Sequence, residues 1–167
     1  FRSTGDGAVT VIDPTGADPA LRLSTETGTV SVAQTVRLPI HKGIPTHDLS
    51  PMDVGLDFKF EAENGSLELL LDDQVLATLD SEGLTDPNPF FAPEPLRDLG
   101  DGWFRLKGVA DPALLDGQSF TDLRLRLQPG SEAAVQVDNL TLVPEPAGFA
   151  LLGVAFGALA LRRRSAA

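Results

Sequence analysis

The chain contains a single tryptophan, Trp103, among its 167 residues. Trp103 shares its parity with Arg105 and Lys107, which alternation places on the outward side of a strand. An exposed indole offers an apolar face on which a sugar ring can stack. The alternative is that Trp103 covers an edge of the fold, which is the more common role because tryptophan is usually well buried.

Asp138 is the candidate ligand for a divalent cation. It stands next to Asn139, where the apolar positions of the last strand change from odd to even numbers and so predict a β-bulge. Ca²⁺ takes about six to eight oxygen ligands, which Asp, Asn and backbone carbonyls supply. A carboxylate that accepts backbone N–H groups at the bulge explains Asp138 equally well. Both roles remain open.

The remaining polar groups do not form a catalytic arrangement. His41 and His47 lie too loosely in a predicted loop over residues 39–51 for a zinc motif, so we interpret them as surface residues. The chain has no cysteine, and the adjacent Asp72 and Asp73 fall on a predicted hairpin tip where water keeps them ionised. There is no nucleophile elbow and no glycine-rich phosphate loop. We therefore predict a protein that is not an enzyme.

The end of the chain divides into three parts of different physical character. The middle part has neither charge nor a hydrogen-bonding side chain, and as a helix it would be about 22 Å long against roughly 30 Å of bilayer hydrocarbon. Being apolar on all sides, it predicts a short transmembrane helix with the basic end in the cytoplasm. The three parts are the motif Pro144, Glu145, Pro146, the helix 147–161, and the basic tail 162–167 with Arg162, Arg163 and Arg164.

This order of a Pro-Glu-Pro motif, a short apolar helix and an arginine cluster resembles the PEP-CTERM sorting signal of Gram-negative bacteria. The resemblance implies that exosortase, a membrane cysteine protease, recognises Pro144, Glu145 and Pro146 and cleaves near them. It also implies export to the cell surface or the extracellular matrix, after transient anchoring in the inner membrane. The resemblance implies a cellular destination for the protein and says nothing about its activity.

Short alternating segments account for most of the chain before the motif. Residues 54–62 are the clearest, with Leu56, Phe58 and Phe60 on one side and Asp57 among the charged residues on the other. Eight or nine such segments with turn signals between them predict an all-β, antiparallel β-sandwich. The segments are 8–12, 20–24, 29–38, 54–62, 66–71, 74–79, 103–109, 120–128 and 133–143.

The segments between the strands carry recognisable turn chemistry. Asn64-Gly65 predicts a tight hairpin between 54–62 and 66–71. Asp72-Asp73 predicts a second hairpin, and residues 110–117 have room for one helical turn. Residues 81–102 are rich in proline and predict a long loop, of a length that is often functional.

The order and spacing of these strands resemble the jelly-roll carbohydrate-binding modules, over roughly residues 9–142. That resemblance implies a jelly-roll sandwich and, in many such modules, a structural Ca²⁺ held by an aspartate of the final strand, here Asp138. It also implies a polysaccharide ligand. The stretches that carry it are Ala20-Leu21-Arg22-Leu23, Val36-Arg37-Leu38-Pro39, Leu56-Asp57-Phe58 and Val137-Asp138-Asn139-Leu140-Thr141-Leu142.

The net negative charge argues against polyanionic partners. The formal charge is −11, and without the three tail arginines ten basic residues face 24 acidic ones, a charge of −14. Such a surface disfavours nucleic acid and anionic lipid. The chain begins at Phe1 with no apolar leader, and a protein with this tail needs an export signal, so we expect a processed or truncated N-terminus.

These observations predict a β-sandwich domain over residues 1–143, a linker over 144–146, a transmembrane helix over 147–161 and a basic cytoplasmic tail over 162–167. The leading functional prediction is an exported surface or matrix protein with a structural or adhesive role in the extracellular polysaccharide layer. The alternative is a carbohydrate-binding module with a defined ligand. An exposed Trp103 on a concave sheet would favour the alternative, and a wholly polar convex sheet would favour the first.

Overall fold

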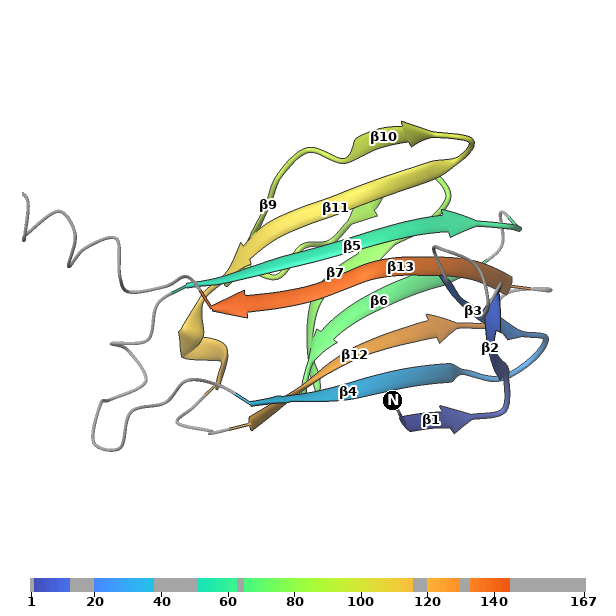
Figure 1. The fold of residues 1–167 in the computed structure, drawn as a ribbon, viewed down its shortest axis with the longest axis horizontal. Helices are drawn as coiled ribbons and strands as arrows, with labels where there is room; N and C mark the ends of the chain where they lie inside the picture. Colours follow the sequence, from blue (N-terminus) through green and yellow to red (C-terminus); the bar gives the residue numbers. More distant parts are fainter. Residues whose placement is uncertain are drawn as a thin grey trace, which may run out of the picture.

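The computed structural model describes residues 2–12, 20–37, 51–62, 65–115, 120–129 and 133–144. In these residues the chain forms two antiparallel sheets that lie one over the other as a sandwich (Figure 1). The predicted fold class, an all-β antiparallel sandwich, is confirmed.

Sheet A has six strands and includes the hairpin predicted around Asp72-Asp73. That hairpin is confirmed, because β6 and β7 pair across it and Asp72 has the positive φ of 50° that a tight turn needs. The strands, in spatial order, are β1 (Arg2–Gly5), β4 (Val30–Arg37), β12 (Phe120–Gln128), β6 (Ser66–Leu71), β7 (Gln74–Leu79) and β8 (Leu84–Thr85).

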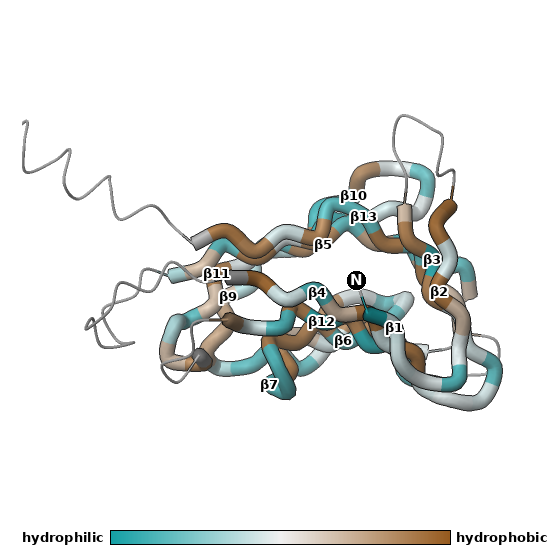
Figure 2. The backbone as a smooth tube through the Cα atoms, turned by 60° about the horizontal axis from the view of Figure 1, so that its bottom comes forward, coloured by the Kyte–Doolittle hydropathy of each residue, from teal (hydrophilic) through white to brown (hydrophobic). Residues whose placement is uncertain are grey.

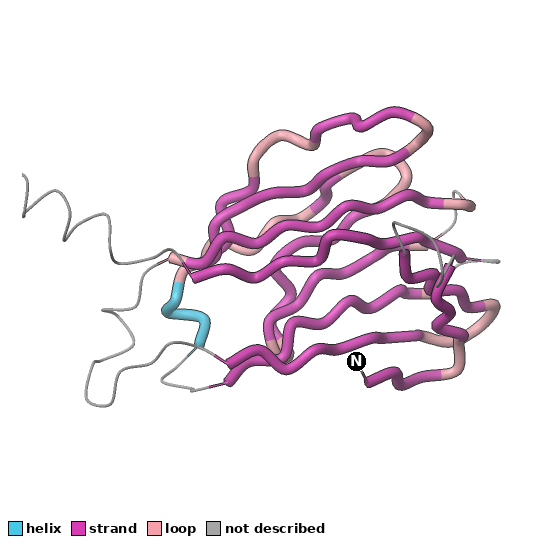
Figure 3. Tube along the Cα trace, in the orientation of Figure 1, coloured by secondary structure: helices cyan, strands magenta, loops and turns pink. Residues whose placement is uncertain are grey.

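Sheet B has seven strands, with β5 and β13 at its centre. The element η2 (Pro112–Leu115) follows β11 and confirms the predicted helical turn; it is the cyan segment in Figure 3. In spatial order six of the strands are β10 (Arg97–Gly100), β11 (Trp103–Ala110), β5 (Met52–Phe60), β13 (Ala133–Pro144), β3 (Ala20–Thr25) and β2 (Ala8–Ile12). The seventh, β9 (Phe91–Pro93), pairs with the last three residues of β11.

Alternation along the strands builds the core between the two layers, as Figure 2 shows by the change of hydropathy from residue to residue. Leu56 and Phe58 are each 1% exposed, and Leu125 on the facing sheet is fully buried. The predicted inward side of residues 54–62 is therefore confirmed, and the alternating burial of β12 places Leu125 on the inward side of residues 120–128. Phe58 packs against Phe60 and Phe104, with ring centroids 5.9 and 6.0 Å away.

The hairpin predicted at Asn64-Gly65 is wrong. Strand β5 pairs with β11 and β13 in sheet B, whereas β6 pairs with β12 and β7 in sheet A. The chain therefore crosses from one sheet to the other after Phe60. An Asn-Gly turn is a local preference, and here pairing of the long β5 along both of its edges decides the outcome instead.

The long loop predicted over residues 81–102 is only partly correct, because it contains the short strands β8, β9 and β10. These strands were not predicted because the segment is rich in proline, which lacks a backbone N–H and is found in sheets mainly at edge strands. Phe90 is 53% exposed and Phe91 is 3% exposed, as expected for adjacent residues of an extended chain, whose side chains point to opposite sides. Strand β1, four exposed residues without an apolar pattern, was not predicted.

The described part of the chain contains no helix that is long and apolar enough to cross a membrane. The predicted helix 147–161 and the basic tail lie outside the described residues, as do Glu145 and Pro146. Pro144 is the last residue of β13, and Met52 is its partner across the sheet.

Candidate functional site

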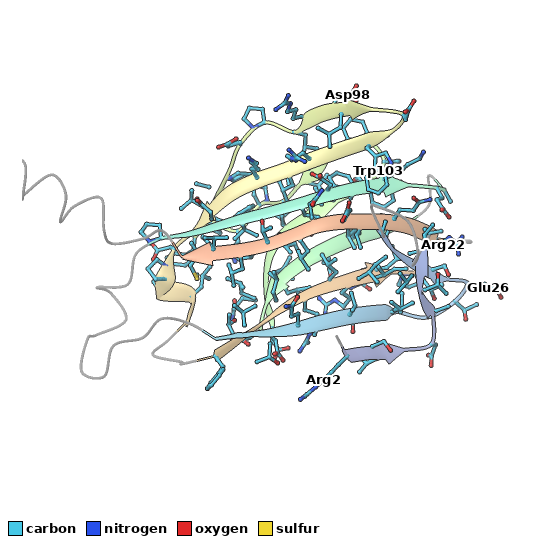
Figure 4. All side chains as sticks on the ribbon, in the orientation of Figure 1. Arg2, Arg22, Glu26, Asp98 and Trp103 are labelled. Carbon is cyan, nitrogen blue, oxygen red and sulfur yellow. The ribbon has the colours of Figure 1, made fainter. Side chains whose placement is uncertain are left out.

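The outer face of sheet B, turned away from the core, carries a set of polar groups beside an aromatic side chain. On β11, β5, β13 and β3 many of the positions that alternate with core residues are occupied by charged or amide side chains. Trp103 and Arg22 mark the face in the right-hand half of Figure 4. The face comprises Arg22, Asp57, Lys59, Trp103, Arg105, Lys107, Gln136, Asp138 and Asn139.

An ion pair occupies the centre of this face. Arg105 and Asp57 are paired across β11 and β5, and the guanidinium Nε and Nη2 donate to Oδ1 and Oδ2 of the carboxylate, each at 2.6 Å. Asn139 Nδ2 also donates to Asp57 Oδ2, at 2.9 Å. The hydrogen bond from Arg105, against the opposing effect of burial, holds the pKa of the Asp57 carboxyl below its ordinary value.

Asp57 corrects one expectation. Alternation placed it outward, where a carboxylate is normally solvated, yet it is only 4% exposed. The register is nevertheless as predicted, since its neighbours Leu56 and Phe58 lie in the core. The Arg105 and Asn139 side chains cover Asp57 from outside, so burial here results from a hydrogen-bonded surface layer.

The predicted bulge at Asp138-Asn139 is confirmed. The pairing of β13 with β5 shifts between Asp138 and Thr141, and Asn139 has a φ of 49°. Asp138 Oδ1 accepts the Asn139 backbone N–H at 2.6 Å, which is the contact that the bulge role requires.

Calcium fits the donors around Asp138 poorly. The adjacent carboxylate of Asp57 already accepts two hydrogen bonds from Arg105. Within the described residues no three His, Cys, Asp or Glu side chains come together to hold a metal ion. A hard cation needs several oxygens at once, so the calcium role of Asp138 stays a prediction.

A second network lies where β5 ends. Glu61 accepts hydrogen bonds from Arg22 Nε at 2.7 Å and from Gln136 Nε2 at 2.5 Å, which joins β3, β5 and β13. Burial alone would raise the pKa of the Glu61 carboxyl, but the hydrogen bonds from Gln136 and Arg22 outweigh it and lower that pKa. These fixed partners hold the three planar side chains in one orientation.

Trp103 is half-buried at the start of β11. Asp101 and Gly102, with φ values of 53° and 77°, form the turn that leads into it from β10. Because Phe104 pairs with Phe58, Trp103 lies beside Lys59 on the outer face and one pleat from Arg105. The indole therefore neither enters the core nor stands free in solvent.

Two hollows adjoin the row that Trp103, Arg105 and Lys107 form. Near Lys107 a hollow of about 220 Å³ exists because Gly55 has no side chain; a Cβ there would lie 2.7 Å from Thr141 Oγ1. At the other end a cleft of about 470 Å³ opens between the sheets, with Glu61 on its wall. Its other walls are Phe58, Phe60, Ala62, Asp80, Ser81, Glu82, Gly83, Leu96, Gly102 and Phe104.

The structure brings together two of the residues singled out from the sequence. Trp103 and Asp138 lie on the same outer face, on the two strands that flank β5. His41 and His47 lie outside the described residues. The ion-pair partners Asp57 and Arg105 were not selected from the sequence, although alternation placed both outward; only the pairing of β11 with β5 shows that they meet.

Comparisons with known proteins give structural likenesses only. No family model and no curated protein matches the chain. The carbohydrate-binding module TmCBM61, solved in complex with β-1,4-galactotriose, aligns over 86% of this chain and 88% of its own, with 12% identity and a TM-score of 0.44.

Two further structures align at a similar level. A CBM4 module covers 82% of this chain and 78% of its own, at 10% identity and a TM-score of 0.46. The arabinose-bound α-L-arabinofuranosidase MgGH51 is covered over 23% of its length and covers 86% of this chain, at 16% identity and a TM-score of 0.49. At these values the neighbours carry no argument about a ligand.

Proposed function

We propose that the outer face of sheet B binds a polysaccharide without catalysing a reaction. One observation carries the proposal: the half-buried Trp103 indole lies in one row with Arg105 and Lys107, beside a hydrogen-bonded network that is already fixed. A wholly polar face would have favoured the structural or adhesive role. The indole favours carbohydrate binding instead.

The row has the dimensions and the chemistry for an extended sugar chain. Trp103 and Lys107 are four residue steps apart along β11, a span of about 13 Å. Trp103 supplies an apolar surface for a sugar ring at one end. In the middle, Arg105 uses two of its five N–H donors on Asp57, and the others remain for hydroxyl groups.

Lys59 and Lys107 add two positive charges beside Trp103 and Arg105 on the proposed binding face. Among the described residues, the ammonium groups of Lys59 and Lys107 form no side-chain hydrogen bond and no ion pair within 4.0 Å, although their charges act on the nearby carboxylates of Glu61 and Asp57. Their ammonium groups are thus available to sugar hydroxyls or to the carboxylates of an acidic polysaccharide. The two ligand classes differ in their response to salt, because only the acidic class releases bound counterions when it pairs with lysine.

Retention on polysaccharide gels tests the proposal. We expect a set of neutral and uronic-acid polysaccharides to include one that slows the chain, and Trp103→Ala to weaken that retention by about tenfold, in line with the loss of one stacking contact. Phe120→Ala is the matched control, since Phe120 is an aromatic residue 54% exposed at the start of β12 in sheet A. Equal retention of both variants contradicts a site at Trp103.

We further propose that residues 144–164 act as a sorting signal for export to the cell surface or matrix. Support comes from the sequence alone: a Pro-Glu-Pro motif, an uncharged stretch of 15 residues and three arginines, in that order. The stretch 147–161 inserts in the inner membrane, with Arg162–Arg164 on the cytoplasmic side. Exosortase then cleaves near Pro144, Glu145 and Pro146.

Mass spectrometry of the protein from an exporting host tests this second proposal. The mature protein should lack residues 151–164, and Glu145→Gln should keep them attached while leaving membrane insertion unchanged. Reversing the charge of the three arginines should impair orientation and retention instead. Mature protein that still carries 151–164 would identify the tail as an ordinary anchor.

A further inference from the structure

Two exposed hydrophobic residues lie at the end of the sandwich where the described chain stops. Of the five large hydrophobic residues exposed in the described part of the chain, Phe90 and Val143 are 53% and 51% exposed, and they belong to segments at the left end in Figure 1, where β13 finishes. A third, Phe120, is 54% exposed at the start of β12, but its parity places it on the opposite, outer face of sheet A. The other two, Val11 and Leu99, lie on β2 and β10, the opposite edges of sheet B.

Strand pairing ties these residues to the chain exit. Val143 and Val109 flank Asp53 on the strands either side of β5, and the next pair along is Pro144 with Met52. Val109 also lines a shallow hollow of about 420 Å³ beside Phe90. The remaining residues of this hollow are Pro51, Pro89, Ala92, Asp111 and Pro112.

The length of chain beyond Pro144 limits what this end can face. Only Glu145 and Pro146 separate β13 from the uncharged stretch 147–161. Fully extended, the chain from Pro144 to Ala147 spans about 10 Å. A membrane segment that begins at Ala147 therefore keeps this end of the sandwich within the reach of the lipid headgroups.

The shortness of that segment strengthens the constraint. A helix of 15 residues is about 8 Å shorter than the hydrocarbon layer that it must cross. The mismatch draws both flanks of the segment toward the bilayer. On one flank arginine side chains can reach outward to the interface, and on the other flank the body itself meets the lipid.

We propose that the exit end, defined by Phe90 and Val143, rests on the lipid surface of the membrane that holds residues 147–161. This inference rests on the proposed membrane segment and adds an orientation to it. The occupant is a zwitterionic lipid interface, because Asp53 and Asp111 lie among the apolar residues and repel anionic headgroups. The outer face of sheet B then stands beside the membrane with Trp103 at its far end.

The single tryptophan makes the contact measurable. Trp103 and Ala110 are the first and last residues of β11, and Ala110 pairs with Phe91, so Trp103 lies about 23 Å along the strand from the exit end. In the full chain carrying Phe90→Trp and Trp103→Phe, the only indole is at the exit end. The unsubstituted chain is the matched control, with its indole at the far end.

Both proteins are reconstituted in phosphatidylcholine vesicles with and without brominated acyl chains, and flotation measures insertion separately. We expect bromolipid to reduce the fluorescence of the Phe90→Trp variant by roughly half, as for an aromatic residue at a membrane interface, and to leave the Trp103 fluorescence unchanged. Replacing half of the lipid with phosphatidylglycerol should weaken the quenching.

The outcomes separate this inference from the proposal beneath it. Vesicles that float the chain without quenching the indole at position 90 overturn the inference and leave the membrane segment standing. A chain that does not float overturns both. An indole at position 90 that is shielded from aqueous acrylamide without vesicles, but only when residues 147–161 are present, shows that this stretch covers the hollow itself and also overturns the inference.

Discussion

The outer faces of the two sheets both carry charged residues at alternate strand positions, yet their carboxylate side chains differ in how far they are exposed to solvent. On sheet A, the side chain of Glu68, bonded to Arg126, is 15% exposed, and that of Asp73, bonded to Arg124 at the hairpin tip, is 91% exposed. On sheet B the side chain of Asp57 is 6% exposed and that of Glu61 is 26% exposed. Of these four carboxylates, the most covered is therefore at the centre of sheet B and the most exposed is at the hairpin tip of sheet A.

The difference teaches where a binding site can form on a flat sheet. Exposed ion pairs hold little energy and little order, because water and ions compete for each partner. Covered pairs keep their geometry and present their remaining donors in fixed directions. The outer face of sheet B adds to this layer an indole at Trp103 and a hollow at Gly55.

The largest expected effect on stability contrasts the two ion pairs. Asp57→Ala should lower the free energy of unfolding by about 1.5 kcal/mol, because it removes the shared acceptor of Arg105 and Asn139 while water can still reach the partly exposed Arg105. Asp73→Ala, which removes the acceptor of Arg124 on sheet A, should change it by about 0.5 kcal/mol or less. Urea unfolding of both variants measures the two changes in unfolding free energy. Equal changes would contradict the proposed difference between the two ion pairs.

The Asp57 carboxylate also predicts a dependence on pH. Its pKa in the folded protein is below the ordinary value of 3.8, so the stability that it contributes is complete above that value. This contribution is lost as the pH falls through the lower, folded-state pKa. The difference in unfolding free energy between the unsubstituted protein and Asp57→Asn should thus be constant from neutral pH to about pH 5 and shrink below 3.8. A difference that grows with acid would contradict the sign.

Two matched triads sharpen the comparison at a smaller scale. Glu61 accepts from Arg22 and Gln136 in sheet B, and Glu68 accepts from Arg126 and Gln128 in sheet A. Glu61→Gln and Glu68→Gln should each lower stability by about 1 kcal/mol, as expected for one charge-assisted network on a surface.

Only the first of these variants should weaken polysaccharide binding. Glu61 orients the planar side chains at the Trp103 end of the proposed row, and Glu68 lies on the opposite sheet. Gel retention of the two variants decides the matter. Similar weakening by Glu68→Gln would indicate a general loss of structure and no particular role for Glu61.

The smallest expected effect concerns calcium. Removal of divalent cations with a chelator should leave the melting temperature unchanged, because the contacts of Asp138 are explained by the bulge. Thermal unfolding with and without chelator is the measurement. A lower melting temperature under chelation, abolished by Asp138→Ala, would establish the calcium role, since a metal that binds only the folded state stabilises it.

The sequence predicted the sandwich well because alternation is a local signal. Leu56 and Phe58 were assigned to the core from parity alone, and the bulge at Asp138-Asn139 from a change of parity. It did not predict which strands are neighbours. The failed hairpin at Asn64-Gly65 illustrates this, since pairing of β5 with β11 and β13 depends on residues about 45 and 80 positions away.

The candidate site was predictable to the extent that it depends on parity. Trp103 was singled out because it shares parity with outward residues, and Asp138 because it stands where the parity of the last strand changes. Asp57, Arg105 and Asn139 gave no comparable signal, because charged residues at outward positions are ordinary in a strand. Their covered network arises from the pairing of three strands, and that pairing is known only once the sheet order is known.

Intrinsic fluorescence tests the central claim most directly, because Trp103 is the only tryptophan in the chain. Titration with a polysaccharide that retains the protein on a gel should shift the emission of Trp103 to shorter wavelength and saturate, since a stacked sugar removes water from the indole. Glu68→Gln should give the same titration curve. A polysaccharide that binds the protein while leaving the emission of Trp103 unchanged would place the ligand elsewhere and contradict the assignment of the outer face of sheet B.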